Sequence, residues 1–502
     1  MNLSILRGCL FGAALLFSSC SGLRKTSALD RLKPCKASDG LGDAYCGTFN
    51  VWEDRVAKTG RKIALKIVLL PALKQDAAPD PLFFLAGGPG QGAAELASAL
   101  QEPYRRIQTD RDIVLVDQRG TGKSNPLDCK AKPGADSNTD SDEDDSAPEM
   151  VARLHACLAS YRGSADVTKY TTPVATDDLD DVRKFLGYEK INLYGVSYGT
   201  RAALVYARLH AANTRAVILD GVAPTDMRLP LYMARDSQRA LDLLIRDCES
   251  DAGCRARFPN LQVRIRALLD GLGAHPQKIH YSDPRTGVAK DLELKRIMVS
   301  AALFSTLYSP LTASLVPLLV EQMEHGNYAG LFAFGAAFDP SALGMAQGMH
   351  FSVVCSEDAT RIEPGSVQKE AANTFVGAEM AEMRLKPCAF WPHTAMDPAY
   401  FENAPSDLPA LILSGELDPV TPPAWGQMVA SQWKNSRHVV VPATGHGTWS
   451  SGCVMKVMAQ FLVDGSAAKL DTGCVQRVKR PPFFLGPAGP DPMATSTKQA
   501  QK

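Results

Sequence analysis

The sequence predicts an α/β fold, in which a mainly parallel sheet carries helices on both faces and a helical cap is inserted late in the chain. Short apolar runs that end in glycine, such as PLFFLAGGPG and DIVLVDQRG, are typical of buried central strands. Segments of helical periodicity separate them, and repeated alternation of strand and helix indicates a parallel sheet. At 224–407 this rhythm stops and helical patterns such as SQRALDLLIRDC take over, which predicts the cap.

The predicted core begins with the two strands of a hairpin in GTFNVWEDRVAKTGRKIALKIVLLPA. Next, DDLDDVRKFLGY has apolar residues at helical spacing and acids at its start, so it predicts an amphipathic helix. INLYGVS, a helix from about 198 to 210, and AVILDG follow, and PALILSGELD and HVVVPATGHG provide strands after the cap. The expected divisions are a core at 35–223 and 408–476, the cap at 224–407, and a flexible tail at 477–502.

Composition narrows the classes of function. The chain of 502 residues is 45% hydrophobic, and its 54 basic and 54 acidic residues give a formal net charge of +0. This balance does not indicate nucleic acid as a partner. Acidic residues concentrate at 131–148 together with Ser, Gly and Pro, so we expect a solvated, flexible loop there.

The N-terminus predicts export. Residues 1–19 hold one Arg, a short apolar region and small residues at the end, which is the layout of a secretory signal peptide. The ending LFSSC also resembles the lipoprotein box of bacteria, in which Cys20 would carry lipid after cleavage. We therefore expect a periplasmic or cell-envelope lipoprotein that meets the membrane only through this lipid. The alternative is ordinary cleavage nearby and a secreted product without an anchor.

Cysteine number also fits an oxidising compartment. Of the 12 cysteines, Cys9 would leave with the signal and Cys20 would carry lipid, so ten remain for disulfides. No CxxC pair or Cys/His cluster indicates a metal, and we expect no metal and no cofactor. Spacing alone leaves the connectivity open, but sequence neighbours suggest five pairs. These pairs are Cys35–Cys46, Cys129–Cys157, Cys248–Cys254, Cys355–Cys388 and Cys453–Cys474.

A lone serine in LYGVSYGTR stands between a predicted strand and a predicted helix. A serine on such a sharp turn projects its hydroxyl, and Gly195 and Gly199 would keep the turn free of side-chain clashes. The pattern G-x-S-x-G occurs by chance in many proteins, where it is only a structural turn. Here the strand and the helix on its two sides favour Ser197 as a catalytic nucleophile.

Serine is a weak nucleophile at neutral pH and needs a base, which in turn needs an orienting acid. Asp418 follows the strand ALILSGEL, and His446 follows RHVVVPATG, so the chain order is Ser, Asp, His. Asp418 has the alternative role of capping a helix near Pro423, and His446 that of a structural histidine. Three candidates at three strand ends in this order favour a catalytic triad.

An oxyanion that forms during the reaction needs hydrogen-bond donors fixed in advance. We expect one donor to be the backbone N–H of Tyr198, directly after the serine. The other should come from AGGPGQGA, where Gly87 and Gly88 let the backbone approach a substrate, and we favour Gly88. This loop lacks the lysine of a phosphate-binding loop, so it does not favour nucleotide binding.

These motifs carry a family resemblance. GGPGQG, DQRGTGKSNPL, DDLDDVRKFLG, INLYGVSYGTR, GELDPVTPP and GHG, in this order, resemble the proline iminopeptidase and tripeptidyl aminopeptidase branch of the α/β-hydrolases. The resemblance spans about residues 45–475, and CGTFNVWEDR is similar to the larger, secreted members of tripeptidyl aminopeptidase type. Ala86 stands where many smaller relatives have His, which leaves the backbone donors of the next two residues in place.

The resemblance implies cleavage of short peptides that have a free N-terminus. A carboxylate in the cap suits the substrate ammonium, and HFSVVCSEDA is similar to a Cys-x-Glu-Asp segment of the larger members. We expect Glu357 to be the anchor and Asp358 to be second to it, although acids at a helix start are the alternative. CAFWP resembles another block of these members, so Trp391 is expected to line the pocket, with core packing as the alternative.

The predicted function is that of a serine exopeptidase, which works through an acyl-enzyme and releases short peptides or single residues, proline among them. Two alternatives remain open at the level of sequence. The same triad can serve an esterase or lipase, because fold and triad do not set the substrate. A binding lipoprotein without activity is the other alternative, and the three triad residues speak against it.

Overall fold

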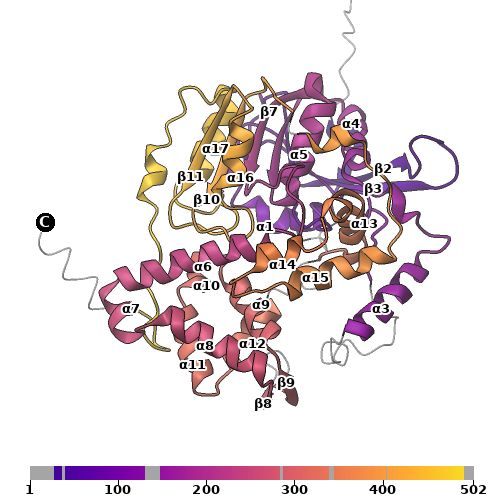
Figure 1. Ribbon diagram of the computed structural model, residues 1–502. Helices are drawn as coiled ribbons and strands as arrows, with labels where there is room; N and C mark the ends of the chain where they lie inside the picture. Colours follow the sequence, from indigo (N-terminus) through magenta and orange to yellow (C-terminus); the bar gives the residue numbers. More distant parts are fainter. Residues whose placement is uncertain are drawn as a thin grey trace, which may run out of the picture.

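The computed structural model describes residues 28–36, 40–129, 147–282, 287–337, 344–402 and 404–490. Nine strands within these ranges form one sheet of order β1-β2-β3-β5-β4-β6-β7-β10-β11 (Figure 1). The strands are β1 Lys33–Pro34, β2 Tyr45–Trp52, β3 Lys62–Leu70, β4 Leu82–Leu85, β5 Ile113–Val116, β6 Ile191–Val196, β7 Thr214–Asp220, β10 Ala410–Gly415 and β11 Ser436–Val441. Pairing is antiparallel from β1 to β5 and parallel from there to β11, which confirms the mainly parallel sheet.

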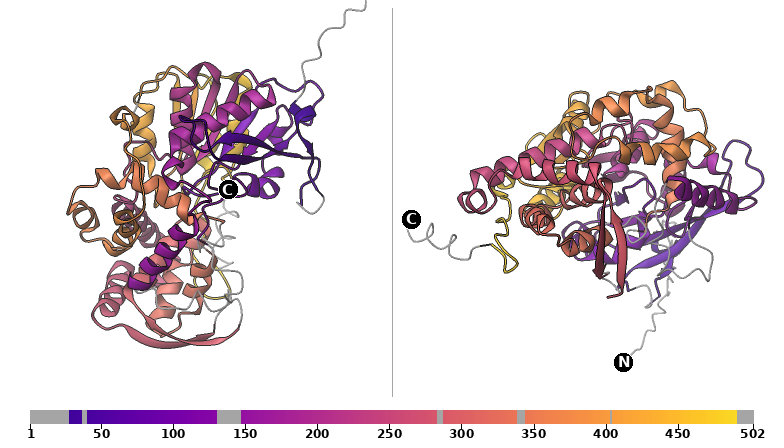
Figure 2. Two further views of the ribbon diagram at one scale, coloured as in Figure 1. Left: turned by 90° about the vertical axis from the view of Figure 1, so that its right-hand side faces the viewer. Right: turned by 60° about the horizontal axis from the view of Figure 1, so that its bottom comes forward.

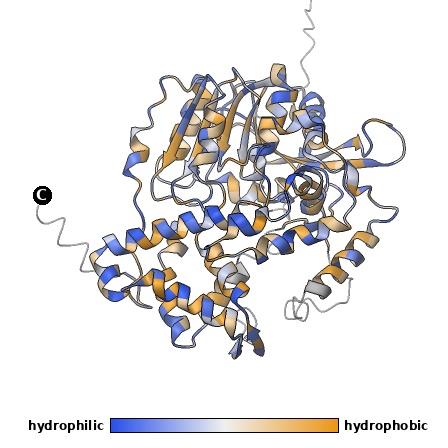
Figure 3. Ribbon diagram, in the orientation of Figure 1, coloured by the Kyte–Doolittle hydropathy of each residue, from blue (hydrophilic) through white to orange (hydrophobic). Residues whose placement is uncertain are grey.

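Alternate residues of the central strands enter hydrophobic layers on opposite faces of the sheet. Leu193 of β6 packs in the layer that contains α4 (Thr172–Leu186) and α5 (Tyr198–Leu209). Its neighbour Tyr194 packs in the other layer, with α17 (Val454–Asp464). Strands buried on both faces read as continuous apolar runs, and the ribbons of the sheet are accordingly largely orange in Figure 3. Four further helices of the core are α1 Ala97–Gln101, α2 Arg105–Gln108, α3 Ala147–Ser160 and α16 Pro423–Ala430.

The cap lies between β7 and β10 in the chain and has a hydrophobic core of its own. It forms a second lobe beside the sheet in the left view of Figure 2. Its helices are α6 Met233–Ser250, α7 Ala252–Arg257, α8 Leu261–Ala274, α9 Arg296–Thr306, α10 Pro310–Ala313, α11 Val316–Glu324, α12 Ala329–Ala337, α14 Ser366–Ala371 and α15 Glu379–Leu385. Helix α13 (Gln347–Glu357), which was predicted as part of the cap, instead packs in the layer of the sheet that contains α4 and α5. An antiparallel hairpin of β8 (Gln277–Ser282) and β9 (Ala289–Leu294) adds a two-stranded element that the helical prediction missed.

Part of the segment that was expected to form a flexible tail is packed against the cap. Phe483 is buried in the hydrophobic core of the cap, and Arg480 forms an ion pair with Asp247 of α6 at 2.7 Å. The prediction of a free tail from residue 477 is therefore wrong for the described part up to 490. The prediction was based on the Pro and Gly content of the segment. It did not take into account that burial of the Phe483 ring is favourable.

The extreme N-terminus and the acidic segment are only partly represented. The predicted signal peptide at 1–19, the lipidation site Cys20 and residues 130–146 of the acidic region lie outside the described residues. No helix within the described ranges is both long enough and apolar enough to cross a bilayer.

Disulfides join the five pairs that the sequence spacing suggested. In the described part of the chain these are Cys35–Cys46, Cys129–Cys157, Cys248–Cys254, Cys355–Cys388 and Cys453–Cys474. The Cα–Cα distances run from 4.9 to 6.3 Å, within the normal range for the bond. Such bonds persist in oxidising compartments, so this set fits a protein outside the cytosol.

Candidate active site

Ser197 occupies a strained turn between β6 and α5. Its backbone has φ 57° and ψ −127°, a conformation that an L-residue adopts only when its surroundings enforce it. A Cβ on Gly195 would lie 2.3 Å from the carbonyl oxygen of Gly199, and a Cβ on Gly199 would lie 2.1 Å from that of Leu85. Only glycine allows this close approach of β6, α5 and β4, which accounts for both glycines around the serine.

Asp418 and His446 form a hydrogen-bonded pair at the ends of β10 and β11. His446 Nδ1 lies 2.8 Å from Asp418 Oδ2, and this contact is held from both sides. The backbone N–H groups of Val420 and Thr421 donate to Asp418 Oδ1, each at 2.8 Å. The Thr421 hydroxyl donates to Asp418 Oδ2 at 2.8 Å and lies 3.1 Å from His446 Nδ1. The carboxylate is thus fixed in place, which the orienting acid of a triad requires.

Burial and charge set the protonation of this pair. The Asp418 side chain is fully buried, whereas 11% of the His446 side chain is exposed. Burial opposes the imidazolium form of His446, but the Asp418 carboxylate outweighs it and raises the histidine pKa. Burial also opposes ionisation of Asp418, yet His446 and the backbone N–H groups of Thr421 and Val420 hold its pKa below the usual value. His446 is therefore a stronger base than a free imidazole.

A third carboxylate, Asp220 at the end of β7, joins the serine turn to the histidine loop. The Ser197 N–H donates to the Asp220 carbonyl at 2.9 Å, and the Thr448 N–H donates to the Asp220 carboxylate at 2.9 Å. A Cβ on the next residue, Gly221, would lie 3.2 Å from His446 Cε1. The turn that carries Ser197 and the loop that carries His446 therefore share one anchor, although no hydrogen bond between their side chains is found among the described residues.

The glycine loop after β4 lies against the serine. A Cβ on Gly87 would sit 3.2 Å from Ser197 Cβ and 3.7 Å from Ser197 Oγ, so the loop backbone borders the hydroxyl. Gly88 has φ +115°, which an L-residue rarely adopts, and a Cβ there would lie 2.6 Å from the Gly90 nitrogen. Tyr198 is the first residue of α5, where a backbone N–H has no partner within the helix. Two sets of backbone donors thus flank the space beside Ser197.

The cap reaches the site through Tyr308, which follows α9. Its carbonyl accepts a hydrogen bond from the His446 N–H at 2.8 Å, and its ring meets the imidazole edge-on with centroids 5.3 Å apart. A Cβ on Gly445 would lie 2.2 Å from the Tyr308 carbonyl oxygen, so glycine permits this close contact. The cap therefore holds the histidine loop as well as covering it.

Two family models match the chain. The α/β hydrolase fold family matches residues 80–254, which include Ser197, and the TAP-like protein family matches residues 373–474, which include Asp418 and His446. The chain therefore has the α/β-hydrolase fold, and its C-terminal region matches the TAP-like protein family.

Three relatives of this α/β-hydrolase have names that describe peptidases. Serine protease Hip1 of Mycobacterium tuberculosis is 25% identical over 485 residues, covering 88% of this chain and 90% of the relative. The tripeptidyl aminopeptidase of Streptomyces coelicolor is 24% identical over 86% of this chain and 82% of its own length. Proline iminopeptidase of Neisseria gonorrhoeae is 28% identical over a shorter stretch, 28% of this chain and 32% of the relative.

Glu357, expected as an open anchor for the substrate ammonium, is instead enclosed in the hydrolase. Its Oε1 accepts a hydrogen bond from the Thr172 N–H at 2.6 Å, and its Oε2 accepts one from the Thr172 hydroxyl at 2.8 Å. The Tyr400 hydroxyl donates to Oε2 as well, and Arg201 Nη1 lies 3.7 Å from it. The side chain is 0% exposed, and burial raises its pKa. Its place in the structure corrects the expected role, because protein donors occupy both oxygens.

Asp358 is enclosed in the same way. Arg201 Nη1 binds its two oxygens at 3.1 and 2.9 Å, and Arg361 Nη2 lies 3.5 Å away. Asp358 and Arg201 are both 0% exposed. A buried guanidinium needs such partners, because an unpaired buried charge costs several kcal/mol. The expected second anchor is therefore the counter-ion of Arg201, a residue one turn after Ser197 on α5.

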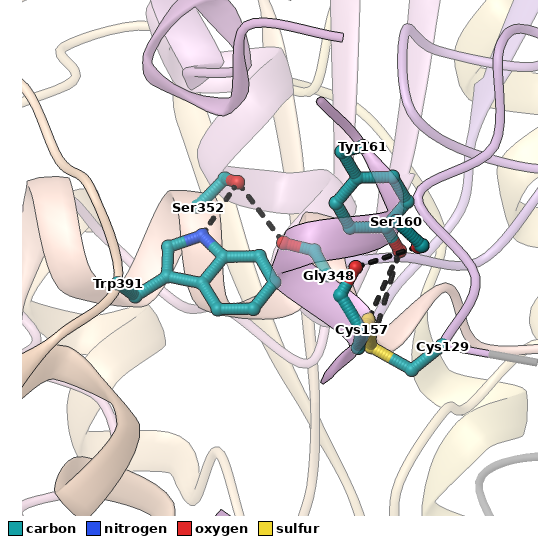
Figure 4. The surroundings of a disulfide bond; sticks show 7 residues. All are labelled: Cys129, Cys157, Ser160, Tyr161, Gly348, Ser352 and Trp391. Carbon is teal, nitrogen blue, oxygen red and sulfur yellow. Dashed lines mark hydrogen bonds between the residues drawn. A yellow bond between two sulfur atoms is a disulfide. The ribbon is translucent and has the colours of Figure 1, made fainter. Parts of the chain in front are cut away.

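Trp391 also differs from its predicted place on the pocket wall. Only 1% of it is exposed, and its Nε1 donates to the Ser352 hydroxyl at 3.1 Å. In Figure 4 the indole lies beside Ser352 and Gly348 of α13, and the ring centroid of Tyr161, which contacts Cys157 of the Cys129–Cys157 disulfide, is 6.4 Å from that of Trp391. Core packing, the alternative for this aromatic, is what the structure shows.

Two residues that contact the candidate triad were not predicted from the sequence. Thr421 stands in the motif DPVTPP, and its position three residues after an acid is one from which a hydroxyl can bond that acid. Asp220 ends the strand in AVILDG, and Asp418 similarly follows closely after its own strand, in ALILSGELD. An acid at the end of the strand next to the serine-bearing strand was the signal available in the sequence.

Proposed function

We propose that this α/β-hydrolase is a serine exopeptidase that releases short peptides or single residues from the free N-termini of peptides. The Asp418–His446 pair, at 2.8 Å and tied to the strained turn of Ser197 through Asp220, is the observation that carries the proposal. The names of the relatives, serine protease, tripeptidyl aminopeptidase and proline iminopeptidase, support a peptidase over an esterase.

In the proposed mechanism, Ser197 Oγ attacks the carbonyl carbon of the scissile bond while His446 Nε2 accepts the hydroxyl proton. Asp418 keeps the proton of the other ring nitrogen, Nδ1, in place and favours the imidazolium that forms. His446 then gives its proton to the leaving amine, and the acyl group stays on Ser197. Water, activated by His446, hydrolyses this acyl-enzyme and restores the serine.

The negative oxygen of the tetrahedral intermediate lies, in this proposal, between the N–H groups of Tyr198 and Gly88. Gly87 brings the loop backbone against the serine, and Tyr198 begins a helix whose N-terminal end favours negative charge. Fixed donors of this kind cost no rearrangement when the charge develops. The substrate ammonium requires a partner other than Glu357, since that carboxylate already accepts hydrogen bonds from Thr172 and Tyr400.

We also propose that the hydrolase is exported and that Cys20, when lipidated, attaches it to a membrane of the cell envelope. The five disulfides support export because such bonds form outside a reducing cytosol. Metabolic labelling with a radioactive fatty acid tests the anchor. Label should enter the wild type and be lost in Cys20→Ala, whereas equal labelling of both proteins would contradict lipidation.

Hydrolysis of matched chromogenic peptides of one, two and three residues, each with a free or an acetylated N-terminus, tests the function. Cleavage of the free forms alone is expected, and Ser197→Ala should abolish it while leaving the melting temperature near that of wild type. Ser98→Ala, which removes an exposed hydroxyl on α1, is the matched control and should retain full activity.

Two results would contradict the proposal in different parts. Equal cleavage of acetylated peptides, or hydrolysis of a simple ester alone, would remove the exopeptidase assignment and leave the nucleophile standing. Normal turnover by Ser197→Ala would remove the nucleophile itself.

A further inference from the structure

Arg384 on α15 is an arginine of the cap whose guanidinium has no acidic partner. Its Nη1 contacts Met233 Sδ at 3.2 Å, and within the described ranges no carboxylate lies within 4.0 Å of it. The side chain is exposed to solvent, yet the surrounding protein lowers its pKa by desolvation. An anion at a guanidinium that solvent reaches and that protein atoms partly surround meets less competition from water than one on an open surface.

Helix packing and the electrostatic effect of Arg384 on two aromatic rings relate this guanidinium to the candidate active site. Helix α15 packs against α9, which ends just before Tyr308, and the Tyr308 ring lies against His446. The charge of Arg384 acts on this ring and opposes the rise in the Tyr308 pKa that burial causes. The charge of Arg384 therefore reaches Tyr308, and the Tyr308 ring contacts His446.

The second ring is that of His350 on α13, and it leads to the other side of the site. Burial and the nearby charge of Arg384 lower the His350 pKa to about 4, so this imidazole is neutral at physiological pH. The backbone of Pro89, within the glycine loop, partly opposes this fall in the His350 pKa. Arg384 therefore lies near one ring that contacts the histidine loop and another that contacts the glycine loop, which together border Ser197.

Arg201, a buried arginine near the site, shows how a guanidinium is paired with carboxylates in this fold. Arg201 has Asp358 at 2.9 Å and Glu357 at 3.7 Å and is fully enclosed. Arg384 has a thioether in place of the carboxylates and is open to solvent. Guanidinium groups bind carboxylates through paired, charge-assisted hydrogen bonds, so the vacant partner of Arg384 is best supplied by a ligand.

We propose that Arg384 binds a carboxylate of the peptide substrate and so selects short acidic or C-terminally free peptides. The inference rests on the proposed peptidase function and adds the chemical class of substrate. The carboxylate has two sources, the C-terminus of a short peptide or an acidic side chain on the leaving-group side of the cut. In both cases the guanidinium stabilises a charge that would otherwise be desolvated under the cap.

The test compares peptide pairs that differ only in this charge. One pair is tetra-alanine as the free acid and as the C-terminal amide, and the other is Ala-Ala-Glu-Ala amide and Ala-Ala-Gln-Ala amide. We expect the wild type to favour the charged member of one pair in kcat/KM by about 10- to 100-fold, as for a charge-assisted bond. Arg384→Gln should lose this preference, and Arg384→Lys should keep part of it.

Arg246→Gln is the matched control, because Arg246 is an exposed arginine on α6 for which the structure shows no side-chain partner. It should keep the wild-type preference. The pair that responds identifies the source of the carboxylate. The proposal is wrong if Arg384→Gln keeps the wild-type preference for the charged peptide in both pairs. It is also wrong if the wild type prefers neither charged peptide.

A binding measurement separates this proposal from the proposed function. The affinity of Ser197→Ala for the same peptides, measured by calorimetry, needs no turnover. Affinity for the charged peptide should fall about 10- to 100-fold when Arg384→Gln is added, even if Ser197 were not the nucleophile. Equal affinities in the presence and absence of Arg384 would overturn the carboxylate site independently of catalysis.

Discussion

Buried carboxylates lie on two sides of Ser197, and their partners give them opposite roles. On one side Asp418 binds His446, an aromatic base whose second ring nitrogen remains available for chemistry. On the other side Glu357 and Asp358 surround Arg201, a cation that cannot give up its proton at physiological pH. The first pair can move a proton, whereas the second cluster can only hold its neighbours in place.

The second cluster still reaches the nucleophile, but through a chain of hydroxyls. The Thr172 hydroxyl donates to Glu357, and it lies 2.6 Å from the Tyr198 hydroxyl. Tyr198 directly follows Ser197, so Glu357 supports the residue whose backbone N–H is proposed to bind the oxyanion. A buried acid near a catalytic residue is therefore not sufficient evidence for a role in chemistry. The partner must also have a free donor or acceptor.

Loss of the acid on the first side should have the largest effect. Asp418→Asn keeps the shape of the side chain but removes the charge that orients and stabilises the imidazolium, so kcat should fall about 10⁴-fold. Steady-state kinetics on a free tripeptide substrate measure the change. Asp407→Asn, at an exposed acid just before β10, is the control and should match wild type. A loss of less than tenfold in Asp418→Asn would remove Asp418 from the triad.

Loss of the acid on the second side should appear in stability and not in substrate binding. Glu357→Ala leaves Arg201 with one counter-ion and leaves Thr172 and Tyr400 without their acceptor. We expect the free energy of unfolding to fall by about 3–5 kcal/mol, as for a broken buried ion pair. Denaturant unfolding and KM of the folded fraction measure the two effects. A tenfold rise in KM with unchanged stability would return Glu357 to the role of ammonium anchor.

Local patterns explain why one side was predictable from the sequence and the other was not. Ser197, Asp418 and His446 each follow a short apolar strand, and parallel strands bring such ends to one edge of a sheet. Glu357 and Trp391 lie on helical or irregular segments whose burial depends on residues far away in the chain. Tyr400 lies 43 positions from Glu357, and Ser352 lies 39 positions from Trp391. Sequence gives no measure of such enclosure.

The cap shows the same limit at the level of the fold. Its position between the strands AVILDG and PALILSGELD follows from the interrupted rhythm, but its internal hairpin does not. The strands β8 and β9 carry alternating exposed and half-buried residues, without the apolar run that identifies the buried strands of the sheet. Tyr308, which joins the cap to the histidine loop, has no local motif either.

A hydroxyl group on the first side should have an intermediate effect. Thr421→Val keeps the volume but removes the donor to Asp418 Oδ2, leaving that oxygen with His446 alone. One lost hydrogen bond to a charged group is worth about 1.5 kcal/mol, so kcat should fall about tenfold with little change in KM. Thr421→Ser, which restores the hydroxyl, should recover most of the activity. Full activity in Thr421→Val would show that the backbone donors of Val420 and Thr421 suffice.

The smallest effect that we expect is a shift in pH dependence, and it separates the two sides most directly. Activity requires neutral His446, and Asp418 raises the pKa of this residue above 6.5 against the effect of burial. The acid limb of kcat/KM should therefore have its midpoint above pH 6.5 in wild type. In Asp418→Asn the raising effect of Asp418 is gone, and burial outweighs the smaller effect of the Asp220 charge. The midpoint should therefore move to lower pH. Glu357→Gln, on the second side, should leave the midpoint where it is.

The same shifts fix the pH range in which the pair stabilises the fold. A raised histidine pKa contributes stability that is complete below the unfolded value of 6.5 and is lost as pH rises through the folded value. A lowered aspartate pKa contributes stability above 3.8 that is lost as pH falls through the folded value. The stability difference between wild type and His446→Gln should therefore be largest between about pH 4 and 6.5 and should shrink on either side. A difference that grows toward pH 9 would mean that His446 is held neutral by the fold, and the comparison between the two sides of Ser197 would fail.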